Sequence, residues 1–388
     1  MGDRVNFANI LRGLAAVSVL FSHYFGVFWS RPDAAAALVN APQIAATDGI
    51  YCLTWLAKDH LYFNSGSFGV ALFFLISGFV IPFSFQSQSR VGFIVSRFMR
   101  LWPTYAVGLT TTLLFVWLSS IVFGRSFPFT TTAIAWNYGL GLRDLARAPD
   151  MDGIVWTLEI EVRFYLLCLI MAPWLRAGRL RAVVVAAAAV ALAGAAANHM
   201  WPSVVAAGGF WVGPVFAASL DSQMILFMLI GTLLNFHMRG HVRSGWLLAL
   251  ITVFFLACGA LWRQGLLAPG FLSGMGSYTA ALVVFSACYR FRERIGMRGT
   301  LESLASTSYS LYVMHAVPGY AIMRIALEYG FRPWTCLGMA LVWVFASTMI
   351  VHQLIEEPTH KLGRKWARSI VRRHAPTSHL PVALATND

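Results

Sequence analysis

The chain has 388 residues, of which 58% are hydrophobic and only 12% are charged, and its formal net charge is +13. Soluble domains are about a quarter charged and just under half apolar, so this composition excludes an ordinary water-soluble fold. The apolar residues form continuous blocks of about 20 residues, the length at which a helix crosses the bilayer core. Because these blocks lack the alternation of barrel strands, the sequence predicts an all-α, polytopic bundle of membrane helices.

About ten membrane helices are expected, with both termini in the cytoplasm. Their approximate bounds, in chain order, are 8–28, 65–85, 101–123, 154–174, 182–198, 221–237, 244–262, 270–289, 303–325 and 335–356. The glycine-rich segment 204–218 is interpreted as a loop or a re-entrant piece. With this topology most of the 29 Lys and Arg residues lie in cytoplasmic segments, as the positive-inside rule requires.

Two parts of the chain differ in composition. Residues 1–360 are expected to form one membrane-embedded domain and residues 361–388 a basic cytoplasmic tail, partly disordered, with no soluble domain appended. The tail can lie on the anionic inner leaflet, so topology and membrane lipids explain the positive charge, and no nucleic acid partner is expected. The five cysteines contain no CxxC pair, which predicts neither a disulfide framework nor a metal site.

The first span contains two ionisable side chains, which are functional candidates because burying a charge in the membrane is costly. Arg12 and His23 are eleven residues apart, so both lie on one helix face, with roughly 16 Å between them along the axis. Taken singly, Arg12 can be a snorkelling residue and His23 a hydrogen-bonded packing histidine. Their shared face favours a functional role for the pair.

A second charged pair, Arg97 and Arg100, lies at the inner end of the third span. These residues are one helical turn apart and face the same way, so they can clamp an anionic cytosolic ligand through forked hydrogen bonds. Orientation by the positive-inside rule is the alternative interpretation. In the second span, Ser77 and Gly78 are expected to serve close helix packing.

The fourth span holds Glu159, Glu161 and Arg163 within five residues, which topology does not explain. Glu159 and Arg163 are spaced i,i+4 and are expected to pair, whereas Glu161 points elsewhere and needs another partner. An internal ion pair that fixes helix packing is the alternative to a functional role. The cost of burying charges in a membrane favours the functional interpretation.

Polar residues also occupy the last two spans. Ser308, Tyr312 and His315 in the ninth span share one helix face. The tenth span ends in Glu356-Glu357-Pro358, which is interpreted as a helix stop.

Taken in order, these residues resemble acyltransferase family 3, a group of bacterial integral-membrane O-acyltransferases, along nearly the whole chain. The matching elements are the Arg12–His23 pair, Phe-Phe-x-x-Ser-Gly-Phe at 73–79, Arg97-x-x-Arg100, Trp156-Thr-Leu-x-x-Glu161-x-x-Phe164-Tyr165, the region of Ser308, Tyr312 and His315, and Ile355-Glu356-x-Pro358. Each element is unspecific alone, and their order carries the resemblance. The family more often has a second acid directly after the Glu161 position, where this chain has Val162.

The resemblance implies transfer of an acyl group from cytosolic acyl-CoA, with acetyl-CoA as the expected donor and no metal. The expected acceptor is a hydroxyl of a carbohydrate, such as an envelope glycan or a lipid-linked glycan, or of a similar molecule, at the bacterial inner (cytoplasmic) membrane. The resemblance assigns Arg12, Arg97 and Arg100 to the CoA phosphates and His23 to the role of catalytic base. An extended pantetheine arm can span the roughly 16 Å between Arg12 and His23.

In the expected mechanism, neutral His23 removes the proton from the acceptor hydroxyl as this attacks the thioester carbonyl. Glu161 orients the imidazole or stabilises its cation, and Tyr312 or His315 donates to the developing oxyanion. An acyl-enzyme on His23 is left open. The alternative function is a multi-span transporter or flippase that uses the buried Arg, Glu and His residues as a substrate path, although the chain shows no Gly- or Pro-broken spans in two matching halves.

Overall fold

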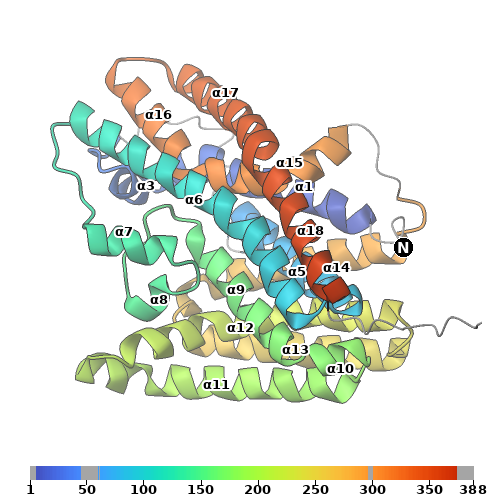
Figure 1. Ribbon diagram of the computed structural model, residues 1–388. Helices are drawn as coiled ribbons and strands as arrows, with labels where there is room; N and C mark the ends of the chain where they lie inside the picture. Colours follow the sequence, from blue (N-terminus) through green and yellow to red (C-terminus); the bar gives the residue numbers. More distant parts are fainter. Residues whose placement is uncertain (1–5, 45–59, 61, 296–299, 374–388) are drawn as a thin grey trace, which may run out of the picture.

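The computed structural model describes residues 6–44, 60, 62–295 and 300–373, and within these ranges its regular elements are all helices (Figure 1). In chain order they are α1 (Asn6–Phe21), the π-helical turn η2 (Ser22–Val27), α2 (Phe28–Ser30), α3 (Pro32–Leu38), α5 (Ser65–Ser87), α6 (Arg90–Val122), α7 (Thr131–Tyr138), α8 (Arg143–Ala146), α9 (Val155–Ile170), α10 (Ala172–Arg176), α11 (Leu180–Ala207), α12 (Val212–Met238), α13 (Ser244–Gln264), the short 3₁₀ turn η4 (Ala268–Gly270), α14 (Phe271–Arg290), α15 (Thr300–Met314), α16 (Ala316–Glu328), α17 (Pro333–Val351), the π-helical turn η5 (His352–Glu356) and α18 (Glu357–Arg373). The all-α prediction is confirmed.

Within the described residues, eight helical segments are long and apolar enough to cross a membrane. They are Asn6–Ser30, Ser65–Ser87, Arg90–Val122, Leu180–Ala207, Val212–Met238, Ser244–Gln264, Ala268–Arg290 and Pro333–Ile370. Each of them overlaps one of the expected spans. The protein is therefore a multi-pass membrane protein.

The other two expected spans, 154–174 and 303–325, are each interrupted in the structure. The first is divided between α9 and α10. The second is divided between α15 and α16, with His315 between them. Pro318 follows in the first turn of α16, and because it has no N–H it cannot bond the carbonyl of Met314 four residues earlier. The break places His315 at a helix end in the middle of the bundle.

The glycine-rich segment 204–218 is neither a loop nor a re-entrant piece, so this prediction is wrong. α11 continues to Ala207 and α12 begins at Val212, which leaves a short turn between two long helices. Gly208 and Gly209 in this turn have φ values of 68° and 84°. Glycine adopts this conformation without steric cost, and it commonly ends a helix. The glycines therefore mark a helical hairpin, and the stretch between the expected spans 182–198 and 221–237 is mostly helical.

α12 is the most buried of the candidate spans, and 89% of its apolar window is inside the protein. It packs against α5, α11 and α13, with α11 and α13 beside it in Figure 1. A Cβ atom on Gly78 of α5 would collide with the backbone of Met228 in α12, so small residues allow the close contact. Asn235 of α12 also donates to the Phe79 carbonyl at 2.8 Å. The expected packing role of Gly78 is confirmed, and these contacts hold α5 against α12.

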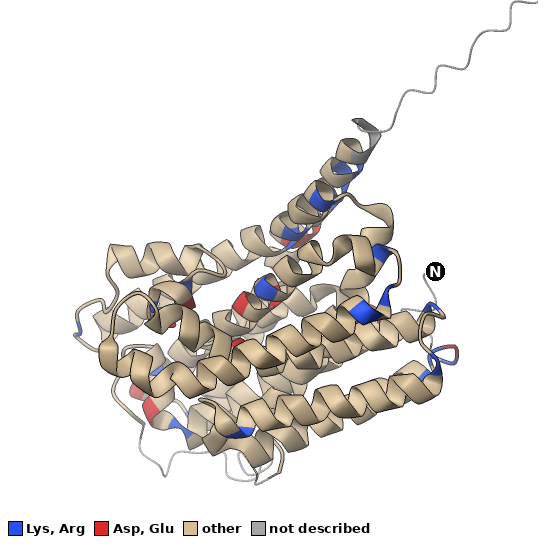
Figure 2. Cartoon of the chain, turned by 90° about the horizontal axis from the view of Figure 1, so that it is seen from below, with Lys and Arg blue, Asp and Glu red and all other residues tan. Residues whose placement is uncertain are grey.

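The helix stop expected at Glu356-Glu357-Pro358 is wrong. α17 continues through η5 into α18, so the chain stays helical from Pro333 to Arg373. The wider π-helical turn ends at Glu356, two residues before Pro358, and changes the hydrogen-bonding pattern near the residue that lacks a donor. The first part of the expected tail, 361–373, is therefore a helix that packs on α6 and stands out from the bundle in Figure 2. Residues 374–388, where disorder was expected, lie outside the described residues.

Candidate active site

Three cavities follow one another along α1 and share lining residues. The arginine cavity has a volume of about 310 Å³ and is lined by Arg12, Arg100, Ser308, Tyr309, His360 and Arg364, among others. The central cavity has about 60 Å³ and is lined by Arg12, Arg100, Glu161, Ser77, Tyr309 and Tyr312, among others. The histidine cavity has about 440 Å³, and its lining includes His23, Val70, Trp156 and Tyr312. The series connects the Arg12 end of α1 with the His23 end.

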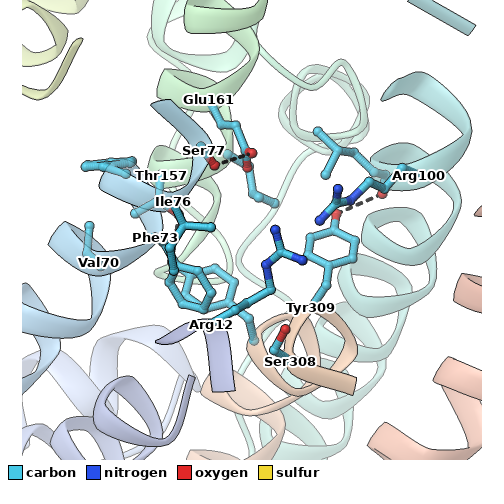
Figure 3. Close-up of a pocket in the computed structure, with 14 residues that line it drawn as sticks. Arg12, Val70, Phe73, Ile76, Ser77, Arg100, Thr157, Glu161, Ser308 and Tyr309 are labelled. Atoms are coloured by element: carbon cyan, nitrogen blue, oxygen red, sulfur yellow. Dashed lines mark hydrogen bonds between the residues drawn. The ribbon is translucent and has the colours of Figure 1, made fainter. Parts of the chain in front are cut away.

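Arg12 of α1 and Arg100 of α6 line both the arginine cavity and the central cavity. Figure 3 shows the two side chains pointing toward the same space, with Glu161 on its other side. Both arginines are half-buried, and neither guanidinium has an ion-pair or hydrogen-bond partner among the residues that the structure describes. Because a buried charge without a partner is costly, this pair is suited to hold an anion such as a phosphate group.

Arg97 does not join this pair, although it lies on the same helix one turn from Arg100. α6 is a 33-residue helix that begins well before the expected span, so Arg97 lies within it and faces α5 and α9. Its guanidinium donates to Ser84 Oγ at 2.5 Å and lies over the rings of Phe93 and Tyr165, at 5.2 and 5.5 Å from their centroids. Arg97 lines a separate, mainly apolar cavity of about 320 Å³.

Glu161 of α9 lies in the central cavity and not beside His23. Its Oε1 accepts hydrogen bonds from Ser77 Oγ at 2.9 Å and from the Tyr165 hydroxyl at 2.5 Å. Ser77 therefore has a polar contact in addition to the packing role expected for it. Glu161 faces Arg12 across the cavity (Figure 3), so the geometry makes it a neighbour of the arginines and not the orienting partner of the imidazole.

His23 lies in the π-helical turn η2, the kind of irregular turn that is frequent at functional sites. Its Nδ1 is 2.9 Å from the Tyr320 hydroxyl of α16, and the two rings stack with centroids 5.9 Å apart. Because Nδ1 is engaged by Tyr320, Nε2 is left for proton chemistry in the histidine cavity, which His23 lines. Sequence reasoning missed Tyr320, since 297 residues separate it from His23.

His315 packs behind His23 and lines none of the three cavities. Its Nδ1 lies 2.7 Å from the Tyr312 carbonyl, and a carbonyl only accepts, so Nδ1 carries the proton. In the neutral ring Nε2 is then an acceptor, and it has no hydrogen-bond partner among the described residues. The Tyr24 hydroxyl donates to the His315 carbonyl at 2.7 Å. A neutral His315 held this way has no free N–H to donate to an oxyanion, the role expected for it.

Tyr312 lines both the central cavity and the histidine cavity. Its hydroxyl is 2.7 Å from Thr157 Oγ1 and 3.4 Å from the Ile154 carbonyl. Thr157 belongs to the Trp156-Thr157 motif at the start of α9, so this hydrogen bond joins α9 to α15. Of the two expected oxyanion donors, Tyr312 is the one whose hydroxyl is placed at the junction of the cavities.

A buried ion-pair network fixes α9 but takes no part in lining the three cavities. Arg163 pairs with Asp221 of α12 at 2.6 Å and with Asp144 of α8 at 3.3 Å. Glu159 pairs with Arg143 of α8 at 2.8 Å. The expected Glu159–Arg163 pair is therefore wrong, because each residue finds its partner on a neighbouring helix. The alternative interpretation, ion pairs that fix helix packing, holds for these two residues.

Comparison with known proteins agrees with this architecture. The profile of acyltransferase family 3, described as an acyltransferase domain, matches residues 5–352. Among curated proteins, the chain is 25% identical over 394 residues to "Nodulation protein 10" of Rhizobium leguminosarum bv. viciae, which covers 93% of this chain and 94% of that protein. No solved structure matches the chain. Since the family profile covers nearly the whole chain, this multi-pass membrane protein belongs to acyltransferase family 3.

Proposed function

We propose that this protein transfers an acyl group, with acetyl as the expected one, from acyl-CoA in the cytosol to a hydroxyl of an envelope glycan, a lipid-linked sugar or a similar acceptor. The proposal places it in the bacterial inner membrane. The observation that carries the proposal is the series of three cavities between Arg12 and His23. The series offers a phosphate site at one end and a proton acceptor at the other.

The donor is proposed to enter through the arginine cavity. Arg12 and Arg100 would hold its diphosphate by forked, charge-assisted hydrogen bonds, which supplies the anion that both guanidinium groups lack. The central cavity measures only about 60 Å³, which suits a slender pantetheine arm better than a bulky group. The arm would extend the roughly 16 Å along α1 that separates Arg12 from His23. The thioester would then lie beside Tyr312.

The acceptor hydroxyl is proposed to bind in the histidine cavity, which is the largest of the three at about 440 Å³. His23 Nε2 removes the hydroxyl proton as the oxygen attacks the thioester carbonyl. The Tyr312 hydroxyl donates to the oxyanion of the tetrahedral intermediate. When this collapses, the carbon–sulfur bond breaks and the proton on His23 passes to the leaving thiolate, which yields the ester and free CoA. His315 is proposed to act through His23, since the two rings are in edge-to-face contact with centroids 4.8 Å apart.

CoA release tests this function. The purified full chain would receive acetyl-CoA with and without a cell-envelope glycan extract, and free thiol would be followed over time. Glycan-stimulated release that His23→Ala abolishes is expected. His199→Ala, a change at an exposed histidine of α11, is the matched control and should keep full release. No release by the well-folded wild type with several acyl-CoAs and several extracts would contradict the proposal and favour the transporter alternative.

A further inference from the structure

The helix α18 carries a stripe of cationic residues beside the arginine cavity. Lys361, Arg364, Lys365 and Arg368 are spaced i, i+3, i+4 and i+7, so they share one helix face. Together with Ser369 they line a groove of about 600 Å³, which we term the basic groove. In Figure 2 these Lys and Arg residues lie along the helix that stands out from the bundle.

Small residues fix how α18 is rotated about its axis. Ala367 is only 1% exposed, and a Cβ atom on Gly363 would collide with the side chain of Met99 in α6. This contact face lies roughly 130° around the helix from the basic face, at 100° per residue. Leu362 and Trp366 are exposed on a third face, the one suited to lipid. The basic face is therefore turned away both from α6 and from the apolar residues that would contact lipid.

The basic groove and the arginine cavity meet at Arg364, which lines both. The acids near this junction are largely engaged. Glu356 accepts from Ser310 at 2.6 Å and lies 3.0 Å from His352, and Glu357 pairs with Lys361 at 2.7 Å.

Glu302 is the third acid of the arginine cavity, and it is exposed. Arg364 has no ion-pair partner within the described ranges. The cationic surface therefore runs from Arg12 and Arg100 outward to Arg368 with few compensating charges. A ligand with phosphate groups at two separated points would match it.

We propose that the basic groove binds the phosphate of the donor that lies farthest from the thioester, the 3′-phosphate of CoA. This rests on the proposed function and extends the donor site beyond Arg12 and Arg100, which would hold the diphosphate. CoA carries these two phosphate groups on either side of its ribose, so a second cationic subsite next to the first fits its chemistry. Phosphates of anionic lipids share that chemistry, and the test separates the two sources.

The test compares acetyl-CoA with acetyl-dephospho-CoA, which lacks the 3′-phosphate. KM would be measured for the wild type, for Lys365→Gln/Arg368→Gln and for the control Arg332→Gln, an exposed residue before α17. The wild type should prefer acetyl-CoA by about tenfold, as one charge-assisted contact of about 1.4 kcal/mol gives. The double variant should lose most of this preference, and Arg332→Gln should keep it. Each assay would be run in phosphatidylcholine nanodiscs and in nanodiscs that contain phosphatidylglycerol.

Equal KM values for the two donors in the wild type would overturn the inference, and so would an unchanged preference in the double variant. The double variant could also lose activity only in nanodiscs that contain phosphatidylglycerol, and by the same factor for both donors. That result would assign the basic groove to lipid headgroups and overturn the inference as well. Absence of thioester turnover with either donor would instead contradict the proposed function itself. The two failures are thus distinguishable.

Discussion

The rings of His23 and His315 lie edge to face, with centroids 4.8 Å apart and an interplanar angle of 73°. The hydrogen bond from His315 Nδ1 to the Tyr312 carbonyl fixes the proton on that nitrogen, so the free lone pair of His315 is on Nε2. His315 is buried and lines none of the three cavities. In the proposed mechanism it would be a positioning residue, which supports the charge that His23 gains when it takes a proton.

Replacement of His315 tests this arrangement. We predict that His315→Ala lowers kcat by about tenfold and leaves KM for acetyl-CoA unchanged. About tenfold is the lower end of the effects seen when a residue that supports a functional histidine is removed. His315→Asn, whose side-chain oxygen can accept a hydrogen bond, should restore part of kcat. Steady-state CoA release gives both constants. A raised KM with unchanged kcat would show that His315 acts on donor binding instead.

The Tyr320 hydroxyl holds Nδ1 of His23, so its removal should impair catalysis with no effect on the fold. Tyr320→Phe is predicted to lower kcat by about tenfold or more, because the imidazole loses the partner that sets its orientation and tautomer. Tyr329→Phe removes a hydroxyl from a residue that is 71% exposed near the end of the same helix and should have no effect. Equal kcat values for Tyr320→Phe and the wild type would mean that this hydrogen bond does not orient the base.

The three arginines should differ in their effect on the donor. Arg12→Gln and Arg100→Gln are each predicted to raise KM for acetyl-CoA by about tenfold or more, since each removes a charge-assisted hydrogen bond of about 1.5–3 kcal/mol. Arg97→Gln should raise it much less, because the Arg97 guanidinium contacts Ser84, Phe93 and Tyr165. Measurement of KM for the three variants decides this. If Arg97→Gln raised KM as much as the other two changes, Arg97 would bind the donor together with Arg12 and Arg100, and the separate apolar cavity that it lines would not explain its role.

The ion-pair network around Arg163 should contribute to stability and not to chemistry. Arg163→Met leaves Asp221 without its ion-pair partner, while Asp144 keeps Arg143 at 2.6 Å. Breaking a buried pair by removing one partner costs about 3–5 kcal/mol. We predict a clearly lower Tm in detergent, followed by tryptophan fluorescence, and a near-normal KM for the fraction that folds. The control is Glu293→Gln, since Glu293 is 76% exposed and its pair with Arg292 spans 3.8 Å. An unchanged Tm for Arg163→Met would show that the network does not hold α9.

The helical periodicity of the sequence predicted which residues of the site share a helix face. It could not predict the partners of these residues on other helices. The common direction of Arg12 and His23 depends only on helical geometry, and the structure places both along one series of cavities. The partners of Arg163 lie 19 and 58 residues away on α8 and α12, so only the packing of those helices selects them. The i,i+4 rule predicted the wrong pair because it considers a single helix.

The break at His315 had a signal in the sequence that the apolar pattern hid. Residues 303–325 are apolar enough to suggest one continuous span, yet Pro318 removes the donor that would bond the Met314 carbonyl. The π-helical turn at His23 had no such signal. The turn itself contacts α16 and α5, and its contact with α16 is what brings Tyr320 to the imidazole.

Transfer of labelled acetyl groups is the most direct test of the central claim, that His23 acts as the base when a donor acyl group is transferred to a hydroxyl acceptor. The purified wild type, His23→Gln and His199→Gln would each receive radiolabelled acetyl-CoA and a cell-envelope glycan extract, and label would be counted in the glycan before and after treatment with hydroxylamine, which cleaves esters. The account predicts hydroxylamine-sensitive label with the wild type and His199→Gln and none with His23→Gln. Equal labelling by His23→Gln, or no labelled ester from the folded wild type, would contradict it.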